Sequence, residues 1–143
     1  RKLRVHAQSA ILKWEKPSDR NLNKTSHLRN KMPYSSFENA NLAASTKTAN
    51  ILAGDINEFI PTDSQINVYA VSGAANVNVT ILADSDVAID DKEIVAIGTT
   101  LDKSQHLLDS FLVAAGTRLA LFLRETGAVA TTDVLSGVEV LPI

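Results

Sequence analysis

One stretch of this sequence constrains the fold more than any other, residues 111–124, which read FLVAAGTRLALFLR. In its second half leucines alternate with other residues, and this period of two predicts a strand with one buried face. The leucines are Leu119, Leu121 and Leu123. Residues 111–113 form a second apolar run, and Ala-Ala-Gly-Thr at 114–117 can turn the chain between the two runs. The stretch therefore predicts a β-hairpin in the middle of a sheet.

Alternation of this kind recurs along the chain from residue 54 onward. It is found at residues 55–61, 65–72, 76–83, 93–99 and 133–141, and Gly, Pro or Asp residues separate these runs. No helical pattern lies between them, which favours antiparallel pairing. The predicted fold class is therefore mainly β, with residues 54–143 forming an antiparallel β-sandwich or jelly roll.

The first 53 residues differ in character and are predicted to be an N-terminal arm, residues 1–36, and a connector, residues 37–53. Residues 17–36 show no period and are predicted to be extended. The connector is either a short helix or further extended chain. Before Pro17, a helix would align five apolar residues in one stripe: Leu3, Ala7, Ala10, Ile11 and Trp14. Leu3, Val5 and Ala7 also alternate, so an extended start is the alternative to this helix.

Charge is segregated between the arm and the rest of the chain. Residues 1–35 have a net charge of +7 and the remainder has −9, although the whole chain has only −2. This asymmetry predicts a basic tail that contacts acidic surface. Neighbouring proteins are favoured over nucleic acid as its partner, because the basic residues form no arginine-rich run. Those basic residues are Arg1, Lys2, Arg4, Lys13, Lys16, Arg20, Lys24, Arg29 and Lys31.

The sequence offers little for a metal or a cofactor. The chain has no cysteine, which excludes disulfides and thiolate metal sites. The acidic segment 84–93 contains oxygen ligands but lacks the spacing of a calcium loop, so we expect a solvated strand connection without a metal. The only candidate ligands are Asp84 and Asp86 with Asp90 or Asp91.

Catalysis and membrane insertion are not expected either. Ser104, His106 and Asp109 have the side chains of a nucleophilic triad, but three residues within six positions cannot readily converge on one another. No glycine pattern would hold a phosphate, and no apolar run approaches the roughly 20 residues that span a bilayer. We therefore predict a protein that is not an enzyme.

A protein interface is predicted instead. If the three leucines face the core, Phe122 points to the opposite face between Arg118 and Arg124, and aromatic and arginine side chains are enriched at contact hot spots. The alternative is a sheet covered on both faces, with Phe122 in the core. Trp14 would likewise pack on the body of its own chain or on that of a neighbour.

The basic arm, the β-sandwich body and the phrase FLVAAGTRL at 111–119 together resemble structural proteins of virus and bacteriophage particles. Small capsid proteins and decoration (cement) proteins of this kind have jelly-roll-like bodies and tails that lace neighbouring subunits together. The resemblance implies a virion structural protein that associates with copies of itself and with a larger shell protein. The alternative is a ligand-binding β-sandwich, such as a carbohydrate-binding module. Such modules display two or more exposed aromatics on one sheet face, and this chain has seven aromatics in all.

Overall fold

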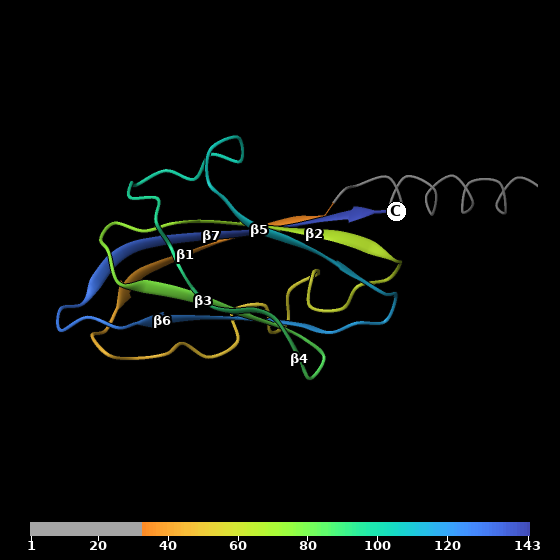
Figure 1. Cartoon of the computed structure of the whole chain (residues 1–143), viewed down its shortest axis with the longest axis horizontal. Helices are drawn as coiled ribbons and strands as arrows, with labels where there is room; N and C mark the ends of the chain where they lie inside the picture. The colour runs from red at the N-terminus through yellow and green to blue at the C-terminus, as the bar shows by residue number, and fades with distance from the viewer. Residues whose placement is uncertain (1–32) are drawn as a thin grey trace, which may run out of the picture. The chain divides into compact units, whose positions relative to one another are not determined.

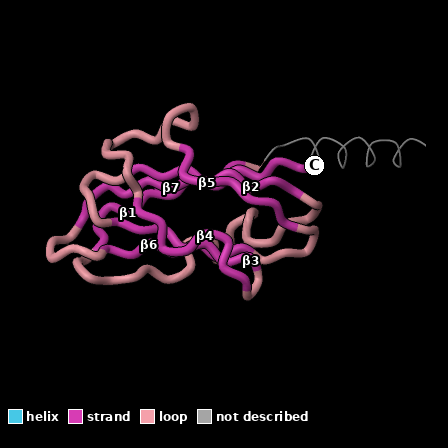
Figure 2. Tube along the Cα trace, in the orientation of Figure 1, coloured by secondary structure: helices cyan, strands magenta, loops and turns pink. Residues whose placement is uncertain are grey.

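The structure, a computed structural model, describes residues 33–143, in which seven strands form two antiparallel sheets (Figure 1). The four-stranded sheet has the order β1 (Tyr34–Leu42), β7 (Thr131–Pro142), β2 (Ser64–Val71) and β5 (Leu107–Val113). The three-stranded sheet has the order β4 (Asp86–Glu93), β3 (Val77–Ala83) and β6 (Leu119–Glu125). Loops and turns connect the strands throughout residues 33–143 (Figure 2).

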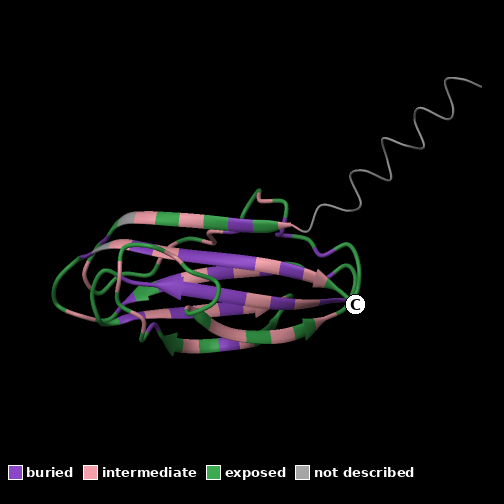
Figure 3. Ribbon diagram, turned by 90° about the horizontal axis from the view of Figure 1, so that it is seen from above, coloured by how far each residue is buried: buried purple, intermediate pink, exposed green. Residues whose placement is uncertain are grey.

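The core lies between the two sheets and is built from alternate residues of the strands (Figure 3). Leu119, Leu121 and Leu123 of β6 are completely buried, as the sequence predicts. Burial of such a side chain contributes about 1.5–3 kcal/mol. Ile66 and Val68 of β2 face them from the four-stranded sheet and are equally buried. The predicted antiparallel β-sandwich is therefore confirmed, and its seven described strands are one fewer than the eight of a jelly roll.

The predicted hairpin at residues 111–124 is wrong. Its two apolar runs do form strands, β5 and β6, but β5 pairs with β2 and β6 pairs with β3, in different sheets. The turn at 114–117 carries the chain across the sandwich, where Gly116 and Thr117 form hydrogen bonds with the backbone of Ile60. Both strands lie at sheet edges rather than in the middle. Alternation specifies which face of a strand is buried but not which strand lies beside it.

The four-stranded sheet begins earlier than the sequence predicts. The body was expected to start at residue 54, after an arm and a connector, whereas β1 occupies residues 34–42 and pairs with β7 along its length. Its inward positions include Ser35 and Asn39, so a hydrophobic pattern does not reveal this strand. The predicted N-terminal helix and residues 1–32 of the predicted arm lie outside the described residues.

Two further predicted strands are loops. In residues 55–61 the Asp55 carboxylate accepts a hydrogen bond from the Asn57 amide at 2.9 Å, and the Glu58 carboxylate accepts one from the Gly54 amide at 2.7 Å. These turn contacts replace strand pairing. Residues 94–99 leave the three-stranded sheet after Glu93 and reach the other sheet, where Ile97 forms an isolated parallel bridge to Ser72. The runs at 65–72, 76–83 and 133–141 are confirmed as β2, β3 and β7.

Candidate functional site

The edges of the two sheets are the places where another chain could add, and the edge of β6 is already covered. Residues 46–51 run beside β6 and hydrogen-bond its outer side. The Leu121 amide donates to Asn50 Oδ1 at 3.0 Å, and the Leu123 amide donates to Thr48 Oγ1 at 3.0 Å. The carbonyls of Leu121 and Leu123 accept from the backbone amides of Ile51 and Thr48. Strand addition at β6 is therefore blocked.

The edge strand β5 is apolar and has one strand partner, β2, among residues 33–143. Leu107 and Leu112 are 53% and 70% exposed, and Ser110 lies between them in the sequence and is also exposed. Val95, which is 82% exposed, lines a shallow depression together with Leu107. β5 and the neighbouring loop therefore present an apolar side of the sandwich to solvent.

The only charged residue of β5 is neutralised from the other sheet. Lys92 of β4 extends to β5, where its Nζ lies 3.0 Å from the Asp109 carboxylate and donates to the Leu108 carbonyl at 2.9 Å. The Lys92 ammonium lowers the pKa of the Asp109 carboxyl, assisted by the Ser110 amide. This ion pair links the edges of the two sheets and leaves β5 without net charge.

The edge strand β4 is acidic. It carries four carboxylates against Lys92, and Asp84 and the strand together place five carboxylates within ten residues. Asp86, Asp90 and Glu93 are exposed. The pairing of β4 with β3 also shifts register at two points. Charge and irregular register both oppose the pairing of β4 with a second, identical β4.

The basic residues of the body are committed to internal contacts. Residues 33–143 contain five Lys and Arg side chains against 14 carboxylates. Four of the five form ion pairs within the described residues, and the fifth, Lys47, lies over the Phe122 ring with its Nζ 4.5 Å from the ring centroid. The four pairs are Lys92 with Asp109, Lys103 with Glu139, Arg118 with Glu58, and Arg124 with Asp91. Ten carboxylates thus have no ion-pair partner within residues 33–143.

Phe122 lies on the outer face of the three-stranded sheet, opposite the core leucines, as predicted. It is half-buried and carries the Lys47 ammonium on its ring. Beside it Arg124 Nε donates to the Asp91 carboxylate at 3.0 Å, and this contact lowers the pKa of the Asp91 carboxyl. Whether this face contacts a partner stays a prediction.

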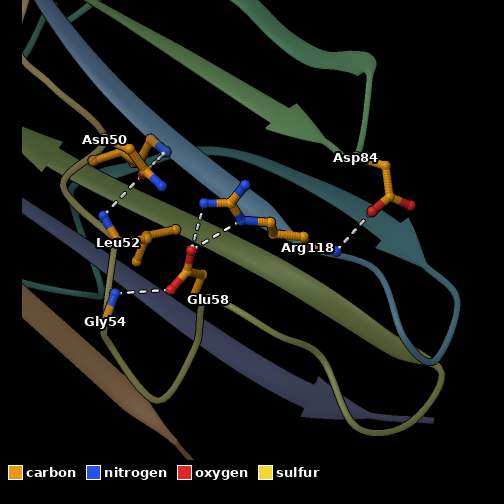
Figure 4. A network of polar contacts seen from close by, with 7 residues as sticks. Asn50, Leu52, Gly54, Glu58, Asp84 and Arg118 are labelled. Carbon is orange, nitrogen blue, oxygen red and sulfur yellow. Dashed lines mark hydrogen bonds and ion pairs between the residues drawn. The ribbon is translucent and has the colours of Figure 1, made fainter.

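Arg118 immediately precedes β6 and belongs to a contact network with Glu58 and Asp84 (Figure 4). Its Nε and Nη2 contact Glu58 Oε1 at 2.9 and 2.7 Å. The backbone amide of Gly54 and the guanidinium together lower the pKa of the Glu58 carboxyl. The Arg118 amide also donates to Asp84 at 2.9 Å. The structure therefore does not bring Arg118 and Arg124 together around Phe122.

In residues 33–143 the candidate metal ligands do not form a metal site, and the candidate triad residues do not form a triad. Asp84 and Asp91 are held by Arg118 and Arg124, and no group of three His, Cys or carboxylate residues that could hold a metal ion occurs in residues 33–143. His106 Nδ1 accepts the Asp102 amide at 2.9 Å. Ser104 donates to the Asp102 carboxylate at 2.7 Å, and Asp109 pairs with Lys92. Ser104, His106 and Asp109 thus make separate contacts.

An aromatic cluster on the outer face of the four-stranded sheet escaped the sequence analysis. Tyr34 and Tyr69 lie edge to face with their ring centroids 6.4 Å apart. Lys103 Nζ lies 4.1 Å from the centroid of the Tyr34 ring and 2.8 Å from the Glu139 carboxylate, which also accepts the Tyr69 hydroxyl. A Cβ on Gly137 would lie 2.5 Å from Tyr34 Oη, so glycine leaves room for the ring. Cross-strand neighbours far apart in sequence form this cluster, and no local pattern could have revealed it.

The nine basic residues of the arm, and Trp14, lie outside the described residues. In residues 33–143 there is no helix long and apolar enough to cross a membrane.

Comparison with known proteins gives no family for this chain. No protein-family model matches the sequence, and no curated protein matches it. Among solved structures, the mitogen YPM derived from Yersinia pseudotuberculosis is similar with a TM-score of 0.44 and 6% identity, over 79% of this chain and 88% of that chain.

Two other structures match less well. The capsular polysaccharide assembling protein CapF from Staphylococcus aureus has a TM-score of 0.34 and 13% identity, over 79% of this chain and 23% of that chain. The structure of infectious bursal disease virus has a TM-score of 0.28 and 10% identity, over 78% of this chain and 30% of that chain. This chain thus spans less than a third of either. All three similarities are too distant to support a function.

Proposed function

We propose that this protein is a non-enzymatic structural protein of a virus or bacteriophage particle, in which copies associate and the basic arm of one copy contacts the acidic body of another. One observation carries the proposal. Residues 33–143 use their own basic residues internally, and ten carboxylates remain without an ion-pair partner there. The arm supplies the complementary charge, +7. Complementary charge steers association and selects the partner.

The acidic strand β4 and the turn before it form the surface that best suits the arm. Asp86, Asp90 and Glu93 are exposed. A second body would bring like charges against this strand, whereas a basic segment would neutralise them. Contacts of this kind are made in solvent and are therefore screened by salt.

The alternative function, a ligand-binding module, has less support. A sugar ring stacks on an open aromatic face, and Tyr34 is the aromatic that the four-stranded sheet exposes. The Lys103 ammonium already lies against this ring and is held by Glu139. A sugar would have to displace the ammonium and break its ion pair.

Sedimentation velocity of the full chain at several salt concentrations tests the proposal. Association should weaken steadily between about 0.05 and 0.5 M NaCl, as the screening length falls from roughly 14 to 4 Å. One variant neutralises the arm with Lys13→Gln, Lys16→Gln and Arg20→Gln. A second neutralises β4 with Asp86→Asn, Asp90→Asn and Glu93→Gln.

If the arm contacts β4, each variant weakens association and the combined variant weakens it by less than the sum of the two. Additive losses would contradict direct contact. A labelled oligonucleotide provides the nucleic-acid control. If the chain binds the oligonucleotide through the arm and does not associate with itself, the proposal is wrong.

A further inference from the structure

We propose that β5 is a self-association edge, at which the β5 strands of two copies pair antiparallel and join their four-stranded sheets into one sheet of eight strands. This inference deepens the proposed function, since it names a surface through which copies meet. It concerns a different surface from the acidic strand that the arm would contact.

The first argument compares three of the four edge strands, β4, β5 and β6. The edge of β6 is covered by residues 46–51, and β4 is acidic and irregularly paired. Among residues 33–143 no segment pairs with the free side of β5, and Lys92 contacts only Leu108 and Asp109 near the start of the strand. Natural sheets guard their edges with charge, bulges or a covering segment, because an open apolar edge pairs with another chain. The single register shift of β5 lies at its start, between Val68 and Tyr69 of the partner strand.

The second argument is electrostatic and identifies the occupant. A two-fold interface places a surface against its own copy, so a body with a net charge of −9 must meet its copy where charge is absent. β5 is such a place, because Lys92 neutralises its only charged residue, Asp109. A basic segment would gain nothing from this edge, whereas an identical apolar strand would.

The third argument is the sequence of the strand. β5 reads LLDSFLV, with apolar residues at both ends and Ser110 at the centre. A two-fold axis through Ser110 would place the two Ser110 residues opposite each other. The axis would also bring the end of one β5, with exposed Leu112, beside the start of the other, with exposed Leu107. Val95, which is 82% exposed, lines the depression next to Leu107 and extends the apolar surface.

The absence of cysteine makes a cross-linking test clean. Directly opposed residues in an antiparallel pair have Cα atoms about 4.5–5.5 Å apart, which matches disulfide geometry. Ser110→Cys in the full chain should therefore give a disulfide-linked dimer on mild oxidation. The matched control is Ser85→Cys, an exposed serine in the turn between β3 and β4. The reaction is run in about 0.5 M NaCl, where arm contacts are screened. Equal cross-linking of the two variants would overturn the inference.

Sedimentation equilibrium in the same salt gives an independent measurement. The wild-type chain should have about twice the chain mass of 15.4 kDa. Leu112→Lys, which places a charge on the proposed edge, should return it to the chain mass, and Val87→Lys on the edge strand β4 should not. Circular dichroism tests whether both variants are folded. If Leu112→Lys does not fold, the comparison of Ser110→Cys with Ser85→Cys decides. A monomeric wild-type chain in high salt refutes the β5 interface. Association that occurs only at low salt would leave the proposed arm contact intact. A β5 dimer without any salt-sensitive association would refute only the proposed arm contact.

Discussion

Replacing Asn50 with alanine should test how residues 46–51 protect the edge of β6. Asn50 Oδ1 accepts the backbone amides of Leu52 and Leu121, both at 3.0 Å, and these two donors identify the atom as the amide oxygen. Asn50 Nδ2 is buried and has no hydrogen-bond partner within the described residues. The side chain is therefore held by its oxygen alone, and alanine leaves two amides without an acceptor.

A buried donor without an acceptor costs about 1–3 kcal/mol. Since the site is only partly buried, water can reach it, and the low end of this range applies to each amide. Asn50→Ala should lower the free energy of unfolding by about 2 kcal/mol, or the melting temperature by roughly 6–10 °C for a domain of this size. Urea unfolding followed by circular dichroism measures this change.

The matched control for Asn50→Ala is Thr48→Val. Thr48 Oγ1 accepts one amide, that of Leu123, so its loss should cost about half as much. If Asn50→Ala changed the free energy of unfolding by less than about 0.5 kcal/mol, the segment would not contribute to the edge as argued. An Asn50→Ala protein that also associates more strongly would indicate that the freed edge of β6 pairs with another chain.

Three further predictions concern the outer faces and the start of the body. Phe122→Ser should leave a folded chain, at a cost of about 0.5–1 kcal/mol for the lost ammonium contact, and should abolish association through this face, but not the β5 dimer, if this face is an interface; a variant that unfolds would contradict the interface role. The Lys103 ammonium lowers the pKa of Glu139, so this carboxylate stabilises the fold above its unfolded pKa, and the contribution is lost as pH falls through the folded pKa. Glu139→Gln should therefore flatten the decline of the free energy of unfolding below about pH 5. An unchanged acid profile would show that the pair is not formed. A chain of residues 33–143 should melt cooperatively, whereas one of residues 49–143, which lacks β1, should melt at a lower temperature; equal melting temperatures would show that β1 adds no stability.

The sequence determined the fold class and the buried face of most strands. The leucines of β6 and the alternating residues of β2 and β3 are inward where alternation places them, because a strand with one face in the core must alternate. The segregation of charge, from which the proposed function follows, is also a property of the sequence. The sequence could not reveal β1, since its inward positions include polar residues and its pairing with β7 is what holds it.

Tertiary structure alone decided which strands are neighbours and which edges are open. The chain between β5 and β6 crosses from one sheet to the other, although a four-residue turn is equally suited to a hairpin. The same crossing places β5 at an exposed edge and gives β6 its cover from residues 46–51, which are some 70 positions away in the sequence. Lys92 neutralises Asp109 only because the edges of the two sheets meet on one side of the sandwich. Such contacts depend on the packing of distant segments, and local periodicity carries no information about them.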